Sequence, residues 1–239
     1  MKILGIESSA MVASAAIWED GVLTAEYTVN HKKTHSQTLL PMIDEICRMT
    51  EQDAKAMDAV AVAAGPGSFT GLRIGSATAK GLGLALGIPL IPVPTLDAMA
   101  YQCFDAESLI CPVMDARRGQ VYNGLYRFEG GEFRILVPSR AVDMAQVIDE
   151  VNKAGGPVVF LGDGVPVHRE TIVRRVRAPF YLAPAVMNRQ RAGAVASLGA
   201  ELYEKGVFQE AGDHAPEYLR PSQAERVREE KQAAQGDKQ

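Results

Sequence analysis

Residues 63–75 read Ala63-Ala64-Gly65-Pro66-Gly67-Ser68-Phe69-Thr70-Gly71-Leu72-Arg73-Ile74-Gly75, and this stretch carries the strongest structural signal in the chain. The apolar run over residues 59–64 predicts a strand that stops at the Gly-Pro-Gly turn. Ser68 and Thr70 then offer side-chain oxygens where a helix can begin. A strand, a glycine turn and a helix start can present free backbone N–H groups to an anion. The stretch lacks the Gly-Lys-Ser/Thr ending of a P-loop, so both a plain strand-to-helix turn and an anion-binding loop remain open.

Composition describes an ordinary globular chain. It has 239 residues, of which 47% are apolar and 23% charged, enough for one large domain or two small ones. The net charge of −4 gives no global electrostatic case for binding nucleic acid. Three cysteines without a CxxC pair suit a reducing cytosol. Neither a signal peptide nor an apolar run of about 20 residues is found, so we expect a cytoplasmic protein that does not enter the membrane.

The order of predicted elements repeats along the chain. In the first half, strands over residues 2–8, 12–18 and 22–29 precede a helix over 36–49, a strand over 59–64 and a helix over 70–86. An apolar connector over 90–93 and a short helix over 95–100 follow. In the second half, strands over 109–115, 120–128 and 133–137 precede a helix over 144–153, a strand over 158–161 and a helix over 167–176.

This repetition predicts an α/β fold with two related lobes, each β-β-β-α-β-α, and a cleft between them. We expect the lobes to cover residues 1–104 and 105–221. A last helical pattern over 191–205 belongs to the second lobe in sequence and is able to pack back on the first. Residues 222–239 contain little that could be buried, which predicts a flexible charged tail.

Two acidic residues end equivalent strands of the two lobes. Glu7 ends the first strand of the first lobe and Asp115 ends the first strand of the second. Facing each other across a cleft, they could hold a phosphate-bound Mg²⁺. Alternatively each caps a turn, with Asp115 paired to Arg117 or Arg118. The candidate nucleotide-binding residues are Glu7, Ser8, Ser9, Gly67, Ser68 and Asp115.

No residue predicts catalysis or a resident metal. His31 and His35 are four residues apart, but Lys32 and Lys33 between them disfavour a dication. Ser68 lacks the Gly-x-Ser-x-Gly pattern of a nucleophile elbow. The cysteines have no neighbouring cation or histidine that would lower the thiol pKa.

The helix over 70–86 contains an unusual number of small residues. Each interior glycine costs roughly 0.5–1 kcal/mol relative to alanine, so a run of them indicates another backbone packed very close. Gly71, Gly75, Ala79 and Leu82 share one stripe, whose neighbour is either internal or a second chain. A separate group of basic residues (Arg169, Arg174, Arg175 and Arg177) lacks interleaved aromatics and fits a solvated helix face better than an RNA site.

Several segments together resemble the bacterial TsaB (YeaZ) family, which serves in making the N6-threonylcarbamoyladenosine of tRNA. They follow one another in order over nearly the whole chain: residues 3–9, 35–41, 65–75, 95–98, 114–122 and 216–220. The Gly-Pro-Gly-Ser-Phe-Thr-Gly-Leu-Arg-Ile-Gly segment is the most specific. The chain departs from the family in having Glu7 where Asp is frequent and Gln120 where Glu is usual.

The resemblance implies an actin-like, sugar-kinase-like fold (the ASKHA and ribonuclease H-like group). The related transferase TsaD carries a His-x-x-x-His metal motif on the helix after the connector, and the matching positions here are Thr95 and Met99. Neither side chain can replace an imidazole on a transition metal. The resemblance therefore implies a non-catalytic paralogue that needs no cofactor of its own, although ATP or ADP with Mg²⁺ at an interface of the complex stays open.

The family also implies partners. These are TsaD, bound through the helices over 36–49 and 70–86, the ATPase TsaE in the same assembly, and a second copy of the chain when TsaD is absent. The implied contact with tRNA is indirect. The predicted interface residues are His35, Leu39, Ile43, Gly71, Gly75, Ala79 and Leu82. The leading hypothesis is thus a scaffold and activator for modifying adenosine 37 of tRNAs that read codons beginning with A. The alternative is a small ATP-dependent phosphotransferase with Mg²⁺ held by Glu7 and Asp115.

Overall fold

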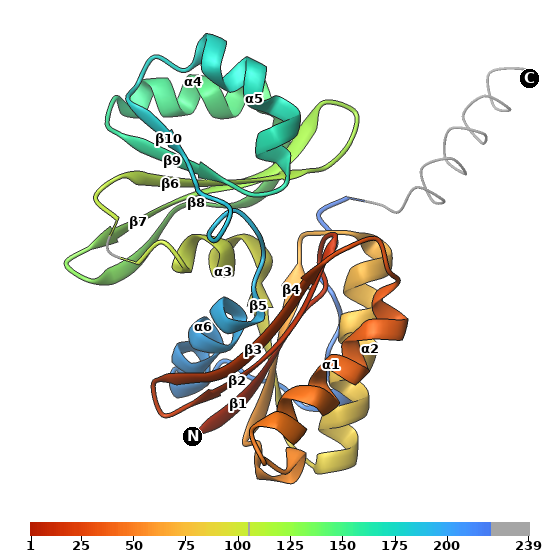
Figure 1. The fold of residues 1–239 in the computed structure, drawn as a ribbon. Coiled ribbons are helices and arrows are strands. Elements are labelled where there is room, and N and C mark those ends of the chain that lie inside the picture. Colours follow the sequence, from red (N-terminus) through yellow and green to blue (C-terminus); the bar gives the residue numbers. More distant parts are fainter. Residues whose placement is uncertain (105, 221–239) are drawn as a thin grey trace, which may run out of the picture.

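The computed structural model describes residues 1–104 and 106–220, arranged as two lobes with a five-stranded sheet in each (Figure 1). The tail predicted over 222–239 lies outside the described residues. The first sheet has the order β3-β2-β1-β4-β5 and consists of β1 (Lys2–Glu7), β2 (Val12–Glu19), β3 (Val22–Asn30), β4 (Ala59–Gly65) and β5 (Leu90–Pro94). The second has the order β10-β9-β6-β7-β8 and consists of β6 (Leu109–Asp115), β7 (Gln120–Glu129), β8 (Glu132–Asp143), β9 (Val158–Leu161) and β10 (Phe180–Leu182).

The two sheets have the same topology. In each, the first three strands form an antiparallel meander, and two further strands extend the sheet in parallel on the other side of the first. This confirms the predicted duplicated, two-lobed, actin-like fold. The outermost parallel strands differ from the prediction, which has a connector over residues 90–93 and no strand at β10, a strand of only three residues. Such short strands are ordered by the neighbouring strand to which they bond, which no local pattern reveals.

In the described part of the chain, six α-helices cover the sheets and join the lobes. In the first lobe α1 (His35–Met49) and α2 (Phe69–Leu86) lie on one face, and α6 (Ala192–Glu204) lies on the other, although it follows the second lobe in sequence (Figure 1). In the second lobe α4 (Met144–Ala154) and α5 (Gly164–Arg175) pack together against the sheet, while α3 (Thr95–Tyr101) lies between the lobes. Short 3₁₀ turns span Ala54–Ala56 and Ala211–Asp213. Among the described residues, no helix combines the length and apolar character that crossing a bilayer needs.

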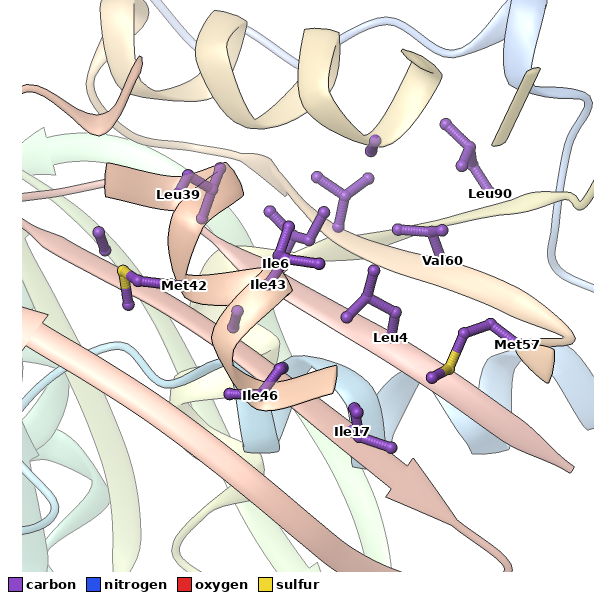
Figure 2. Close-up of a cluster of buried hydrophobic side chains, with 14 of the residues drawn as sticks. Leu4, Ile6, Ile17, Leu39, Met42, Ile43, Ile46, Met57, Val60 and Leu90 are labelled. Carbon is purple, nitrogen blue, oxygen red and sulfur yellow. The ribbon is translucent and has the colours of Figure 1, made fainter. Parts of the chain in front are cut away.

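The core of the first lobe explains why β1 is apolar along its whole length. Leu4 pairs with Ile17 on one side and Val60 on the other, and all three face α1 and α2 (Figure 2). Ile3 points to the opposite face and packs in the cluster with α6. A central strand covered on both faces has no solvent side to carry polar residues.

The same core corrects part of the predicted partner interface. Leu39 and Ile43 of α1 point into the lobe beside Leu4 and Ile6 (Figure 2), and their side chains are 1% and 3% exposed. Gly71, Gly75 and Ala79 of α2 are buried as well. These five positions are therefore unavailable to another chain, because the strands of their own lobe already cover them. Of the seven predicted interface residues, only His35 and Leu82 are partly exposed.

Candidate functional site

A cavity of about 660 Å³ lies between the lobes. The first lobe contributes the residues after β1, the start of α1 and the start of α2; the second contributes the ends of β6 and β9; and the segment 217–220 closes one side. Four of the six candidate nucleotide-binding residues line it: Ser9, Gly67, Ser68 and Asp115. Glu7 and Ser8 do not, and each is only 1% exposed.

The glycine turn packs on the end of β1. A side chain at Gly67 or Gly71 would overlap the backbone carbonyl oxygens of Ser9 and Ser8 respectively. The Ser68 amide donates to the Ser9 carbonyl at 2.6 Å, and the Gly71 amide donates to the Ser68 hydroxyl at 3.4 Å. These glycines thus allow strand and helix to meet inside the protein. That geometry favours the strand-to-helix turn over an anion-binding loop.

Glu7 is buried and does not line the cavity. Its Oε1 accepts a hydrogen bond from the Ser9 amide at 2.6 Å. Burial raises the pKa of the Glu7 carboxyl to about 7, and the negative charge of Asp163 adds to the shift. A carboxyl that is enclosed, bonded to the backbone and partly protonated near neutral pH does not fit a ligand of Mg²⁺, which prefers ionised and accessible oxygens.

Asp115 supports its own turn. Its Oδ1 accepts from the Arg117 amide at 2.8 Å, and its Oδ2 lies 3.5 Å from the Arg117 guanidinium. Arg117 and Arg118 both have left-handed backbone conformations, with φ of 67° and 55°, which cost non-glycine residues about 1 kcal/mol each. The bond from Asp115 helps to hold this turn, so the alternative in which Asp115 caps a turn and pairs with Arg117 agrees with the structure. Across the described residues, no three His, Cys, Asp or Glu side chains gather closely enough to hold a metal ion.

Asp163 is a cavity residue that sequence reasoning did not assign. It follows β9, and its Oδ1 is buried without a hydrogen-bond partner. Burial raises the pKa of its carboxyl, and Asp115 adds a repulsive contribution. The sequence feature that could have identified Asp163 is the Gly162-Asp163-Gly164 turn after an apolar strand, because this turn is equivalent to the end of β4 in the other lobe.

The segment 217–220 holds both lobes, and we call it the C-terminal strap. The Glu217 amide donates to the Ala64 carbonyl at the end of β4 at 2.7 Å. The Tyr218 ring packs on Phe69 of α2 with centroids 4.7 Å apart. Arg220 reaches the second lobe, where its Nη1 donates to the Ala116 carbonyl at 2.5 Å. The strap therefore contacts both walls of the cavity. The only signal for it in the sequence was the resemblance of residues 216–220 to the family.

Thr95 and Met99 lie in the short helix between the lobes. They are 0% and 1% exposed, and Met99 packs among apolar side chains of both lobes. In the same helix Asp97 accepts a hydrogen bond from the Tyr126 hydroxyl of β7 at 2.8 Å. The helix thus serves as a packed joint between the lobes.

Comparison with known proteins shows to which family this chain belongs. The family model described as TsaD: tRNA N6-adenosine threonylcarbamoyltransferase matches residues 23–227. The tRNA threonylcarbamoyladenosine biosynthesis protein TsaB of Bacillus subtilis is 35% identical over 94% of this chain and 96% of its own length. The chain belongs to the TsaB family. The TsaB of Escherichia coli is 32% identical over 69% of this chain and 72% of its own.

Solved structures agree with membership of the TsaB (YeaZ) family. YeaZ from Pseudomonas aeruginosa superposes with a TM-score of 0.78 at 26% identity, covering 91% of this chain and 99% of that one. A TsaB-family chain is therefore matched over nearly its full length in both sequence and fold. Five of the six segments that carried the family resemblance contribute residues to the walls of the interlobe cavity (3–9, 35–41, 65–75, 114–122 and 216–220), and the sixth (95–98) lies in the joint helix α3.

Proposed function

We propose that this chain is a non-catalytic scaffold and activator subunit in the synthesis of N6-threonylcarbamoyladenosine at position 37 of tRNAs that read codons beginning with A. It pairs with TsaD, which transfers the threonylcarbamoyl group, and assembles with the ATPase TsaE. Without TsaD it forms a homodimer through the same surface. Since its complex acts on tRNA, we place it in the cytoplasm.

The observation that carries this proposal is the pair Thr95 and Met99 in a chain that belongs to the TsaB family from end to end. TsaD resembles this chain but has two histidines at the matching positions. A threonine hydroxyl and a methionine thioether, both enclosed in the joint between the lobes, offer no imidazole to a metal and no path for substrate. A member of the TsaB family that lacks the two histidine ligands is suited to assist the related enzyme TsaD.

The surface we propose for TsaD is the outward side of α1 and α2, which we call the outer helix face. The inward sides of both helices form the core, and their outward sides carry exposed apolar residues. Leu40 and Leu84 are 56% and 67% exposed. On the same helix as Leu84, the small residues Ala77 and Gly81 of α2 are exposed and let another helix approach closely. Large apolar side chains next to small ones are a favourable composition for helix–helix contact.

The competing function, an ATP-dependent phosphotransferase, finds less support. It needs Glu7 and Asp115 on Mg²⁺, but Glu7 is turned to the Ser9 amide and Asp115 to the Arg117 turn. The cavity is large enough for a small ligand, and ATP or ADP at an interface of the assembled complex is compatible with the proposal. Titration of the isolated chain with Mg·ATP separates the two functions, because tight binding and phosphate transfer are expected only of the enzyme.

Reconstitution tests the proposal directly. Unmodified tRNA is incubated with TsaD, TsaE, ATP and a source of threonylcarbamoyl-adenylate, with and without this chain, and threonylcarbamoyladenosine is measured by mass spectrometry of nucleosides. We expect modification only when the chain is present, and none from the chain alone. Full-rate modification by TsaD and TsaE without it would refute the activator role.

A further inference from the structure

The second lobe carries an open hollow where the ends of α4 and α5 meet, and it shares no lining residue with the interlobe cavity. It has a volume of about 510 Å³. Four of its lining side chains are cationic, one is anionic and none is aromatic: Asp149, Asn152, Lys153, Arg174, Arg175 and Arg177. We call this the basic hollow. Arg169, which lies near these arginines in sequence, does not line it, whereas Lys153 joins from another helix.

A built contact holds the basic hollow in shape. The Asn152 side chain of α4 donates to the Arg175 carbonyl at 3.1 Å and accepts from the Arg177 amide at 2.7 Å. Val176 between them is buried and extended. Arg175 ends α5 and Arg177 follows Val176, and both arginines line the hollow. Asn152 therefore fixes the segment from which two of the cations project.

The positive charge in the basic hollow exceeds what the protein itself neutralises. Arg175 lies 3.7 Å from Asp149, and Arg174 lies 4.0 Å from the highly exposed Glu170. Exposed ion pairs of this kind contribute little to the stability of the fold. Within the described part of the chain, Lys153 and Arg177 have no ion pair. The C-terminal ends of the two helices together supply about one negative charge, so of the two cations without an ion pair about one positive charge stays uncompensated.

Phosphate is the chemistry that suits this arrangement. Arginine presents a planar fork of N–H donors that binds phosphate oxygens in pairs. Without an aromatic side chain the hollow offers no platform for a base, which favours contacts to a sugar–phosphate backbone. The net charge of the chain is −4, so the protein as a whole does not attract RNA and any attraction must come from a local patch.

We propose that the basic hollow binds the phosphate backbone of the tRNA on which the complex acts. This rests on the proposed function for the identity of the RNA. It differs from the indirect contact that the family resemblance implied, and from the solvated helix face that the arginines alone suggested. In this arrangement the first lobe holds the catalytic partner and the second lobe holds the tRNA.

The test measures binding of unmodified tRNA to the full-length chain by fluorescence anisotropy at NaCl concentrations from 50 to 300 mM. The variant R174A/R177A removes two cations of the hollow. The control R134A/K205A removes two exposed cations elsewhere, each of which already pairs with a neighbouring acid. Each lost phosphate contact reduces the slope of log affinity against log salt by roughly 0.7–0.9. We expect the hollow variant to bind about tenfold more weakly near 100 mM salt, with a slope smaller by about 1.5.

The two variants decide the assignment. A control that binds as the wild-type chain does, beside a weakened hollow variant, supports it, and a KM for tRNA raised in the reconstituted complex with unchanged kcat extends it to the reaction. Equal binding by both variants overturns it. Stronger binding to anionic lipid vesicles than to tRNA through the same arginines also overturns it. Co-purification with TsaD reports on the proposed function separately, because the hollow lies outside the outer helix face.

Discussion

The carbonyl oxygen of Ser8, at the end of β1, occupies the place that a side chain on Gly71 of α2 would need. The Ser8 hydroxyl does the same one turn later at Gly75, and it is held there by donating to the Gly71 carbonyl at 2.9 Å. The stripe of small residues thus brings α2 onto the first strand of its own lobe. Of the two hypotheses for that stripe, packing within the same lobe is correct and packing against a second chain is not.

Replacing Gly75 by leucine should therefore destabilise the fold. The new side chain would meet a hydroxyl that is already committed to a backbone bond, so strand and helix must separate. Overpacking of this kind costs about 1–3 kcal/mol and more where a backbone is displaced. Urea denaturation followed by circular dichroism measures the change. Had the stripe faced a partner, the variant would instead stay folded and lose only that partner.

Gly81 of α2 is the matched control, since a side chain added there meets nothing within 4 Å. Gly81→Ala should raise the stability of the isolated chain by about 0.5–1 kcal/mol through helix propensity alone. A Gly75→Leu variant as stable as Gly81→Ala would contradict the close packing described here.

The outer helix face should be sensitive to charge. Leu40→Asp and Leu84→Asp place a carboxylate on exposed positions, so the fold should lose less than about 0.5 kcal/mol. Burying that carboxylate against TsaD without a partner is costly, so pairing should weaken by at least about tenfold. Co-purification and isothermal titration with TsaD measure the loss. Leu136→Asp, at a 46% exposed position of β8, should leave pairing unchanged.

Glu7 should make the protein less stable as the pH rises. The folded-state pKa of about 7 lies above the ordinary value of 4.5, so folding favours the protonated form. The stabilisation is complete below pH 4.5 and is lost as the pH rises through about 7. Because the shift corresponds to about 3 kcal/mol, the free energy of unfolding of the wild-type chain should fall by about that much more than that of Glu7→Gln between pH 5 and pH 8.5. Urea titrations at several pH values measure both curves, and parallel curves would show that Glu7 is ionised without penalty in the folded protein.

The C-terminal strap should loosen when its contact with the second lobe is removed. Arg220→Ala deletes the hydrogen bond to the Ala116 carbonyl, which contributes about 1 kcal/mol. The Glu217 amide should then exchange with deuterium about fivefold faster, as followed by mass spectrometry of the peptide that contains it. Arg134→Ala on β8, which removes an arginine from an exposed ion pair, is the control and should leave that peptide unchanged.

Local patterns were sufficient for most of the architecture. The spacing of apolar residues located the core of each described α-helix and the strands of both meanders, because amphipathic periodicity is a property of consecutive residues. The repetition of that order predicted two lobes. The resemblance to TsaD matched Thr95 and Met99 to the positions of its histidine motif, and from this we predicted no histidine metal site in this chain.

The site was only partly predictable. Ser9, Gly67, Ser68 and Asp115 were placed together correctly because equivalent strand ends of a duplicated fold converge on one cleft. Asp163 was missed, since its role depends on burial beside Asp115 that no pattern displays. Glu7 was included wrongly as a cavity residue, because the burial of its carboxyl and the hydrogen bond from the Ser9 amide depend on tertiary packing.

By itself the sequence determined the fold class and the membership of the TsaB family, because each depends on which residues occur and in what order. Only the tertiary structure decided which side of α2 is internal, that the strap joins both lobes, and that Asn152 brings Lys153 beside the arginines of α5. These relationships join residues that are far apart in the chain. They are set by how helices and sheets pack, which depends on the shapes of both surfaces at once.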